Sequence, residues 1–475
     1  MLQFCGIGVL FSQETNKEYL TKCKKSDKPL CKHFKEACPM ETHIDKLKAT
    51  LYDLIHEMSA HYWLYVSDPE RDFSRERKLS FEKVMAILVS MGGGSLRNEL
   101  IDNFHCSADM ASAPAFVQRR AQLLPEALEY LFHRFTEATV KEHLYKGYRL
   151  LAADGSDLQI FADPNDSDSY YPGTNGQKHY GMLHINAVYD ILNRTYQDIL
   201  IQKGRKMNEN AALVQMTDRS SVSKAILIAD RNYEAYNGIA HIEKKGWKYL
   251  IRIRDTAGMI RPFHFSSDCD LDVWKTVTLT RKQTNAFKKM KADDPARYRC
   301  LPNSSPFDYI DLHENKFYDM NIRFVRFKIT DDTYETLITN LPSDEFSSSE
   351  IKYLYNLRWG IETSFRELKY TIGLKQPVSK KAEHIYQEIF ARCIMYNFCE
   401  LVTSHIAIHY QSEKYVYQTN FSAAVHICRL FLRGSVAPPD AETNISRNLV
   451  PVRPNRKAPR NANRPRFNGF LYKVA

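Results

Sequence analysis

The spacing of apolar residues separates a helical part of the chain from a part that alternates strands and helices. Between residues 41 and 145 the apolar positions recur at the three- and four-residue intervals of amphipathic helices. This spacing predicts helices in HIDKLKATLYDLIHEM, FEKVMAILVSM, SLRNELIDNF and, as one long helix, AFVQRRAQLLPEALEYLFHRF. The two middle helices meet across Gly92 to Gly94, with Ser95 as the next N-cap, which predicts a helix-turn-helix or a plain packed pair.

From Tyr148 onward the apolar pattern changes to that of strands. YRLLAADGSDLQI, GMLHINAVYD and RTYQDILIQ are apolar or alternating segments bounded by turn residues. A helix capped by Asn208, a strand AILIAD, a helix that ends at Gly246 and a strand WKYLIRIR follow. Three strands followed by alternating helix and strand predict an α/β core of the ribonuclease H-like type, a mixed sheet flanked by helices.

The alternation stops between residues 255 and 345. VWKTVTLTRK, FYDMNIRFVRFKI and YETLITNL predict strands, and no helix of comparable length is expected among them. The intervening stretch RKQTNAFKKMKADDPARYR carries seven basic residues from Arg281 to Arg299. We therefore expect an inserted β-rich subdomain with a basic surface, although such charge runs lie more often in solvated loops than in binding grooves.

Composition excludes a membrane protein and a disulfide framework. No stretch approaches the roughly 18 uncharged apolar residues that a membrane helix needs, and ten cysteines without paired spacing favour a reducing cytoplasm. Cys23, Cys31, His33 and Cys38 are potential zinc ligands, but their gaps match no common zinc motif. The net charge of +10 fits a polyanionic partner.

The C-terminal segment from Ile445 to Ala475 is strongly basic. It contains eight Lys or Arg residues, no acidic residue, and several prolines. Such a segment buries too little apolar surface to fold alone. It predicts a solvated tail that contacts nucleic acid, with a simple solubilising tail as the alternative.

The segment YLYNLRWGIETSFRELKY, residues 353 to 370, predicts a helix with charged groups beside its buried stripe. On a helical wheel the stripe consists of Leu354, Leu357, Ile361, Phe365 and Leu368. Directly beside it lie Tyr355, Arg358, Glu362 and Lys369, bordered by Trp359 and Arg366. A solvated helix would scatter its charges over the outer arc. The alternative interpretation is two ion pairs, Arg358 with Glu362 and Glu362 with Arg366, each worth a few tenths of a kcal/mol.

Two aspartates each follow a short apolar run. They are Asp154 in RLLAADGS and Asp230 in AILIADRNY, and side chains at such strand ends point into ligand clefts. Asp154 with Gly155 also fits a plain turn, and Asp157 competes for the same role. Together with Glu362 the two aspartates predict an all-oxygen site that suits Mg²⁺ or Mn²⁺. Two such ions about 4 Å apart can promote phosphodiester chemistry.

The spacing of Tyr355, Arg358, Glu362 and Lys369 resembles the Y-x2-R-x3-E-x6-K signature of the insertion-sequence transposases of family four. This is a DDE group with a ribonuclease H-like catalytic core, and the resemblance spans roughly residues 75 to 405, with its DGS and DRNY motifs. It implies that Asp154, Asp230 and Glu362 are the catalytic, metal-binding triad for two Mg²⁺ ions, for which Mn²⁺ substitutes. It also implies that Tyr355, Arg358 and Lys369 bind DNA phosphates.

The resemblance further implies cut-and-paste transposition. Members nick DNA at the element's 3′ ends, form and reopen a hairpin, and join the ends to target DNA as a homodimer, in the bacterial cytoplasm at the nucleoid. Trp359 matches a tryptophan that stacks on a flipped DNA base in some members. Trp274 and Tyr334 are the candidates for the second stacking residue. The alternatives are a metal-dependent DNA nuclease without strand transfer and a non-enzymatic DNA-binding derivative of a transposase.

Six segments follow from the patterns and the resemblance together. They are a disordered or dispensable leader (1–40), a helical DNA-binding region (41–145), a first core part (146–254), the β-rich insertion (255–345), a second core part with the Glu362 helix (346–405), and a C-terminal helix with the basic tail (406–475).

Overall fold

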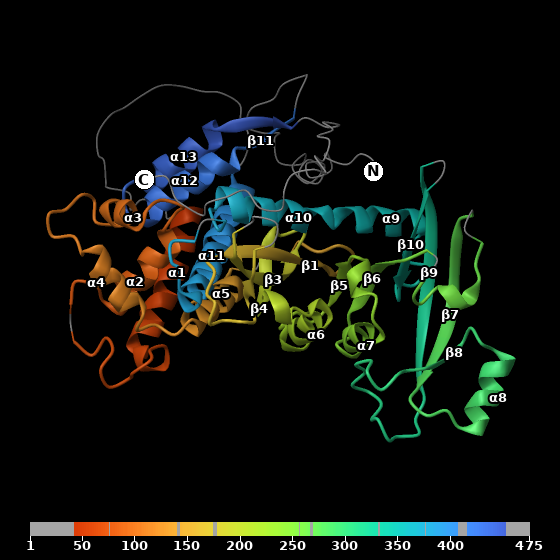
Figure 1. The fold of residues 1–475 in the computed structure, drawn as a ribbon. Helices are drawn as coiled ribbons and strands as arrows, with labels where there is room; N and C mark the ends of the chain where they lie inside the picture. Colours follow the sequence, from red (N-terminus) through yellow and green to blue (C-terminus); the bar gives the residue numbers. More distant parts are fainter. Residues whose placement is uncertain are drawn as a thin grey trace, which may run out of the picture. The chain divides into compact units, whose positions relative to one another are not determined.

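The computed structural model describes residues 42–452, apart from residues 76, 140–142, 174–177, 256, 267–268, 331–332, 376 and 407–415 (Figure 1). The predicted leader, its four potential zinc ligands and the basic residues beyond 452 lie outside this range. Chain contacts divide the described residues into two compact units. Unit 1 comprises residues 42–123 and 398–452, and unit 2 comprises residues 124–397.

Unit 1 is built mainly of helices. From the N-terminal part of the chain come α1 (His43–Ala60), η1 (Tyr62–Leu64), α2 (Phe81–Ser90), α3 (Leu96–Asn103) and α4 (Ala113–Arg120). From the C-terminal part come the end of α11 (Ala382–His405), then α12 (Phe421–Leu432), α13 (Pro438–Arg447) and a small sheet of β11 (Val416–Thr419) with β12 (Leu449–Val452). The helices α1 to α3 lie where the apolar spacing predicts them.

The glycine turn between α2 and α3 is held from inside unit 1. Ser95 caps α3, as predicted, and accepts a hydrogen bond from the amide of Asn98. The amides of Gly92 and Gly94 donate to the Glu99 carboxylate at 2.8 and 2.9 Å, and that carboxylate also binds Arg433 at 2.6 Å. The turn amides are therefore engaged by the protein's own side chain.

Two predicted boundaries were wrong, one in the N-terminal helical part and one at the start of the C-terminal basic tail. The segment predicted as one long helix forms α4, which ends at Arg120, and α5 (Glu126–Ala138) of unit 2. Pro125 separates them, because it lacks an amide hydrogen and disfavours helical geometry in the residue before it. The basic tail also begins later than predicted, since residues 445–452 contribute to α13 and to β12, which pairs with β11.

Unit 2 is organised around one large mixed sheet. In the described residues ten strands join it: β1 (Arg149–Ile160), β2 (Tyr170–Tyr171), β3 (Tyr180–Asp190), β4 (Thr195–Lys203), β5 (Ala225–Ala229), β6 (Lys248–Ile253), β7 (Leu271–Thr280), β8 (Tyr298–Cys300), β9 (Tyr318–Thr330) and β10 (Thr333–Thr339). Their order is β2-β3-β1-β5-β6-β10-β9-β7-β8, and β4 pairs with β3. The neighbours β1, β5 and β6 run parallel. A mixed α/β fold is thereby confirmed.

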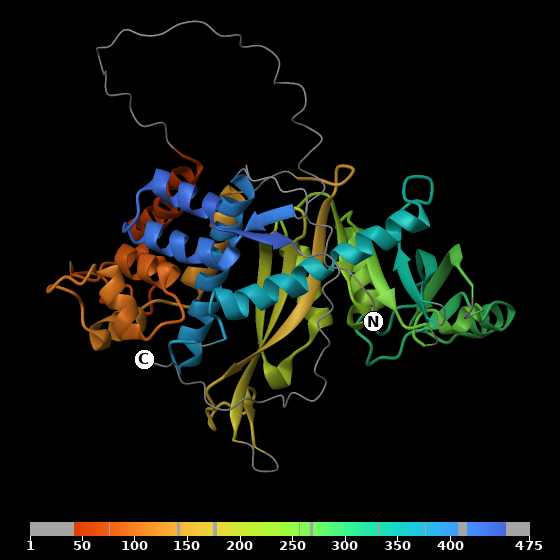
Figure 2. The same ribbon diagram turned by 90° about the horizontal axis from the view of Figure 1, so that it is seen from above.

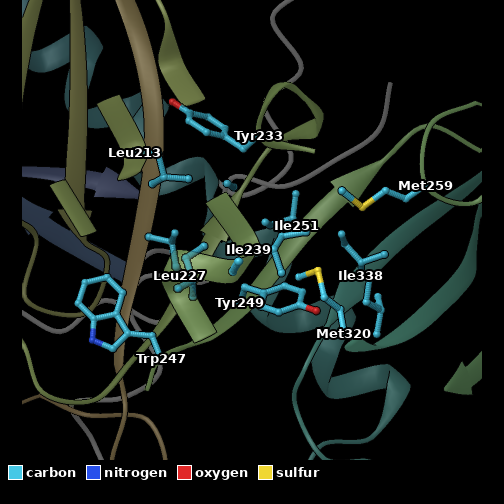
Figure 3. Close-up of a cluster of buried hydrophobic side chains, with 14 of the residues drawn as sticks. Leu213, Leu227, Tyr233, Ile239, Trp247, Tyr249, Ile251, Met259, Met320 and Ile338 are labelled. Carbon is cyan, nitrogen blue, oxygen red and sulfur yellow. The ribbon is translucent and has the colours of Figure 1, made fainter. Parts of the chain in front are cut away.

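Helices cover both faces of this sheet (Figures 1 and 2). One face packs against α6 (Glu209–Arg219) and α7 (Tyr236–Lys244), and Figure 3 shows part of that core, including Leu213, Leu227 and Ile239. The other face packs against α9 (Ser348–Leu357), and its core holds Leu150, Ile228 and Leu354. Because strand side chains alternate, the even-numbered residues of β1, β5 and β6 face α9 and the odd-numbered ones face α6 and α7.

The strands of the insertion extend the same sheet. β10 pairs with β6, β9 with β10, and β7 with β9. The expectation of no helix of comparable length in this region was wrong, because the basic stretch forms α8 (Asn285–Asp293), which is as long as α7. Thr284 caps this helix and Phe287 anchors it with a buried ring.

The remaining elements of unit 2 are short turns or helices that come after the last strand of the sheet in the sequence. They are the 3-10 turns η2 (Gly204–Lys206), η3 (Arg231–Tyr233) and η4 (Arg261–Phe263), the helix α10 (Trp359–Arg366) with the π-helical turn η5 (Glu367–Thr371), and most of α11. Among the helices that the structure describes, none combines the length and apolar content needed to cross a bilayer.

Candidate active site

Asp154 and Asp230 lie at the same level along two neighbouring parallel strands. The register of β1 and β5 pairs Ala153 with Ala229, and the two aspartates are the next residues along each strand. Both numbers are even, so both side chains belong to the face that α9 covers. The strand predicted over YRLLAADGSDLQI is confirmed as β1, which continues to Ile160, so Asp154 lies inside a strand and the alternative of a plain turn with Gly155 is excluded. Only the parallel pairing with β5 ends there.

The helix that carries Glu362 lies across this edge of the sheet. Ser347 caps α9, and an irregular position at Arg358 joins α9 to α10. The Arg358 guanidinium lies 2.7 Å from the Glu362 carboxylate and 3.6 Å from the Asp154 carboxylate. The first contact is the predicted pair within the helix. The second contact, with Asp154, joins the helix to β1. An ion pair that served only to stabilise the helix would not make this contact.

The carboxylates of this edge influence one another. The pKa of Asp154 is raised to about 6, mainly because burial disfavours its charged form. The negative charges of Asp230 and Glu362 raise it further, whereas Arg358 and the Gly155 amide lower it. The three acids predicted from sequence therefore share one electrostatic environment.

Tyr355 and Lys369 reach the same edge from the helix. Tyr355 is buried, and burial raises its pKa to about 12. Lys369 donates to the Ser156 hydroxyl at 2.7 Å and to the Asp157 carbonyl at 2.6 Å, and burial lowers its pKa. The expectation of one unbroken α-helix through residue 370 was wrong, because Lys369 lies in the π-helical turn η5.

Trp359 projects into solvent beside Arg358. Its side chain is 46% exposed, and the Arg358 guanidinium lies 5.5 Å from its ring. The two candidates for a second stacking residue lie in the insertion, where Trp274 is exposed on β7 and Tyr334 is partly buried on β10. Their role stays a prediction.

Asp157, the rival of Asp154, faces the other side of the sheet. Its carboxylate lies 2.8 Å from Nδ1 of His184, whose Nε2 lies 3.1 Å from the Glu209 carboxylate. These two acids outweigh the effect of burial and raise the pKa of His184 to about 9. Asp157 is therefore engaged on the α6 side of β1, away from Glu362.

The same His184 cluster explains the glycine of the DGS motif. A Cβ atom on Gly155 would lie 2.4 Å from both the His184 ring and the Glu209 carboxylate. Real Cβ atoms do not approach other atoms so closely. Gly155 thus lets β1 carry Asp154 on one face while the imidazole packs against the other.

Two further charged residues of this edge were missed from the sequence. The register pairs Ala229 of β5 with Ile251 of β6, so Arg252 follows Asp154 and Asp230 as the third residue of the row. Its Nε lies 3.1 Å from the carboxylate of Glu335 on β10. Arg252 stands near the end of the apolar run WKYLIRIR, as Asp230 does in its own run, and that position was the available signal.

The donor chemistry of the edge fits a divalent cation. In the described part of the chain no group of three His, Cys, Asp or Glu side chains is arranged as a metal site. Here Arg358 lies between Asp154 and Glu362 and balances part of their charge. The donors are carboxylate oxygens, the ligands that Mg²⁺ and Mn²⁺ prefer, and Asp230 and Glu362 add negative charge beside the buried Asp154.

Comparison with known families identifies the class. A family model described as "Transposase DDE domain" matches residues 145–398, more than half of the chain. The chain belongs to this family of DDE transposases. All the predicted site residues lie inside the matched range.

Individual relatives are transposases of insertion sequences. The transposase for insertion sequence element IS1151 of Clostridium perfringens is 22% identical over 312 residues, which cover 58% of this chain and 65% of that protein. The transposase for insertion sequence element IS421 of Escherichia coli is 26% identical over 195 residues, which cover 39% of this chain and 50% of that protein. The chain thus matches between half and just under two thirds of the length of these relatives.

A solved structure is also similar in part. It is a piggyBac transposase synaptic complex with hairpin DNA, with a TM-score of 0.44 and 11% identity over 86% of this chain and 84% of that one.

Proposed function

We propose that this protein is an insertion-sequence transposase that cuts and joins DNA with the edge formed by Asp154, Asp230 and Glu362. The observation that carries the proposal is the register of β1 and β5, which sets Asp154 beside Asp230, together with Arg358, which bridges Asp154 to Glu362. Family membership supports the same reaction class. In this proposal β1, β3 to β6 and the helices on both faces form a ribonuclease H-like core.

The three carboxylates would hold two Mg²⁺ ions, for which Mn²⁺ substitutes. When bound, such ions lower the pKa of an attacking water or 3′ hydroxyl and stabilise the charge on the leaving oxygen. The contribution of the chain is to fix three oxygen donors from two strands and one helix. Arg358 contributes a cation that keeps Asp154 and Glu362 oriented while the site is assembled.

Four side chains would bind the DNA phosphates along this edge. Arg358 presents a forked guanidinium, and Arg252 offers another that is 42% exposed. Lys369 supplies a point charge from its place over Ser156 and Asp157, and Tyr355 supplies a hydroxyl that its raised pKa keeps protonated. They would hold the phosphodiester still relative to the attacking oxygen, which is where such a site gains most of its rate.

The proposed reaction proceeds by successive phosphodiester exchanges. Water attacks the phosphate at each element end and releases a 3′ hydroxyl. That hydroxyl attacks a phosphodiester of the opposite strand, displaces the 3′ oxygen of the flanking DNA and closes a hairpin. Water reopens the hairpin and regenerates the 3′ hydroxyl, which then attacks target DNA and displaces one of its 3′ oxygens. Trp359 would stack on a base flipped out at the hairpin, which offsets the cost of unstacking. A homodimer, with the helices of residues 41–145 as DNA-binding region, would pair the two ends at the bacterial nucleoid.

A metal-dependent nuclease without strand transfer is the second candidate. It needs the same carboxylates, but hydrolysis alone gives little reason for four phosphate ligands beside them. A nuclease would release hydrolysed ends and yield no joined products. Product analysis therefore separates the two functions.

The test uses the protein with DNA that carries the terminal inverted repeats of its own element. The repeats are identified as inverted sequences that flank the gene and are bounded by short direct duplications. With Mg²⁺ the protein should nick these ends and join them to target DNA, and Asp230→Asn should bind the ends but cut nothing. Cleavage by Asp230→Asn at the normal rate would refute the proposed site. If the unchanged protein cleaves the ends but does not join them to target DNA, the nuclease function is supported instead.

A further inference from the structure

Glu335 is a buried acid at an edge that is otherwise arranged to bind phosphate. It lies on β10, and its side chain is 11% exposed. Leu337, two residues along the strand, pairs with Arg252 of β6, so Glu335 and Arg252 lie on the same face of the sheet. This face also carries Asp230. Burial raises the pKa of Glu335, although the positive charges of Arg252 and Arg358 oppose that shift.

A carboxylate in this place is unfavourable for simple DNA binding. It repels a phosphate that approaches Arg252 or Arg358, and its burial costs free energy unless a cation pairs with it. An apolar residue would fill the position at no such cost, since its cross-strand neighbour is the buried ring of Phe327. The charge of Glu335 therefore calls for an explanation other than packing.

The contact between the two side chains is directional. Glu335 Oε1 lies 3.1 Å from Nε of Arg252, the nitrogen nearest the backbone in that guanidinium. Contact at Nε leaves the two terminal nitrogens for another acceptor, and the Arg252 side chain is 42% exposed. A long exposed arginine samples many rotamers, and an ion pair at Nε restricts that freedom.

Arg252 lies next to the proposed active site. The registers of β1, β5 and β6 place Asp154, Asp230 and Arg252 in one row across three parallel strands. Electrostatic influence on Tyr355 comes from Arg358, Glu335, Arg252 and Asp230 together, so the pair borders the proposed phosphate ligands of the helix. The Arg252 side chain therefore leaves the sheet on the strand next to that of Asp230, a proposed metal ligand.

We propose that Glu335 is a positioning residue, which holds Arg252 by its Nε so that the terminal nitrogens bind the phosphodiester next to Asp230. The inference rests on the proposed function. Glu335 itself touches no DNA, and its carboxylate lowers the affinity for DNA while it improves the placement of the phosphate. It thus trades binding strength for reaction rate.

The experiment separates binding from cleavage in single-turnover assays on the element ends. Glu335→Gln keeps the size of the side chain and removes its charge. We expect unchanged or tighter DNA binding, because a buried negative charge is gone, together with cleavage that is about 10-fold slower, because Arg252 is no longer fixed. Arg252→Ala should weaken binding and slow cleavage about 100-fold.

The double variant tests whether Glu335 acts through Arg252. Adding Glu335→Gln to Arg252→Ala should cause no further loss of cleavage, because residues that act through one another are not additive. Additive losses would overturn the proposal, and so would a parallel loss of binding and cleavage in Glu335→Gln alone, which is the result of a purely structural role. Unchanged cleavage in Glu335→Gln would also overturn it.

Two controls keep this failure distinct from failure of the proposed function. Thermal unfolding of Glu335→Gln and of the double variant should stay close to that of the unchanged protein, whereas Arg252→Ala leaves the buried Glu335 carboxylate unpaired and should unfold at a lower temperature. The unchanged protein must cut its element ends, and Asp230→Asn must not cut them. If either of these two results is not obtained, the proposed function is wrong. If both results are obtained and only the Glu335 variants differ from the expected rates, the positioning role of Glu335 alone is wrong.

Discussion

Two charge clusters lie on opposite faces of β1, three residues apart, and each sets one cationic side chain between two carboxylates. On the α9 face Arg358 lies between Asp154 and Glu362. On the α6 face His184 lies between Asp157 and Glu209. Their makeup is similar, so the differences between them are informative.

The clusters differ in how completely their charges are balanced. Around His184 both ring nitrogens face acids, and the pKa of the imidazole is raised to about 9, so the cation is stabilised. Around Arg358 a third acid, Asp230, adds negative charge, and the pKa of Asp154 is raised to about 6. The folded protein therefore favours the charged form of His184 and disfavours the charged form of Asp154, the latter mainly through burial.

The largest expected difference between the clusters is in catalysis. Asp154→Asn should lower the rate of DNA cleavage by about 10³-fold or more, as loss of a residue that acts as part of a catalytic unit does. Asp157→Asn, the matched change three residues away, should stay within about 10-fold, since it keeps the backbone carbonyl that accepts from Lys369. Both are measured as single-turnover rates with Mg²⁺. A greater loss in Asp157→Asn than in Asp154→Asn would reverse the assignment of the two faces.

The second prediction concerns pH and the His184 cluster. The pKa of His184 in the folded protein, about 9, lies above its ordinary value of 6.5. Its contribution to stability is therefore complete below pH 6.5 and is lost as the pH rises through about 9. The free energy of unfolding should fall by about 1 to 3 kcal/mol over that window.

Urea denaturation at a series of pH values measures this loss. In His184→Gln the difference from the unchanged protein should shrink as the pH rises, because the variant lacks the charged form. A constant difference between pH 6 and 9.5 would show that His184 does not titrate as the cluster requires.

The third prediction concerns Asp154, whose charged form is disfavoured in the folded protein, whereas that of His184 is favoured. Its folded pKa, about 6, lies above the ordinary value of 3.8, so the folded state binds more protons between these pH values and loses stability as the pH rises through that window. With a chelator present above pH 7, Asp154→Asn should therefore raise the free energy of unfolding by about 1 to 2 kcal/mol. Asp157→Asn should lower it under the same conditions. A destabilised Asp154→Asn would mean that its charge is already balanced.

The smallest effect is expected where the two clusters share backbone. Gly155→Ala adds a Cβ atom 2.4 Å from His184 and Glu209, whose side chains must shift. The strain should cost about 1 kcal/mol, the lower end of the range for overpacking, because the carboxylate of Glu209 can move. Thermal unfolding measures it, and Glu209→Ala in the same chain should recover part of the loss. No recovery would locate the strain elsewhere.

Periodicity in the sequence predicted most of the elements but not their interruptions. The apolar spacing gave α1 to α3, the strands β1, β3 to β7, β9 and β10, and the helices between them. It missed the break at Pro125, the helix α8 and the π-helical turn at Lys369. Each of these is decided by one local residue or by packing, which the average over a window hides.

The sequence alone determined which acids and bases are available, their order along the chain, and the placement of Tyr355, Arg358, Glu362 and Lys369 on one side of a helix. Only the tertiary structure decided which of them meet, because the pairing of strands fixes the level at which side chains leave the sheet. That register sets Arg252 beside Asp230 and Glu335 beside Arg252, and the alternation of side chains directs Asp157 to His184 instead of Glu362. Local periodicity carries no information on pairing between distant strands, so these contacts had to await the fold.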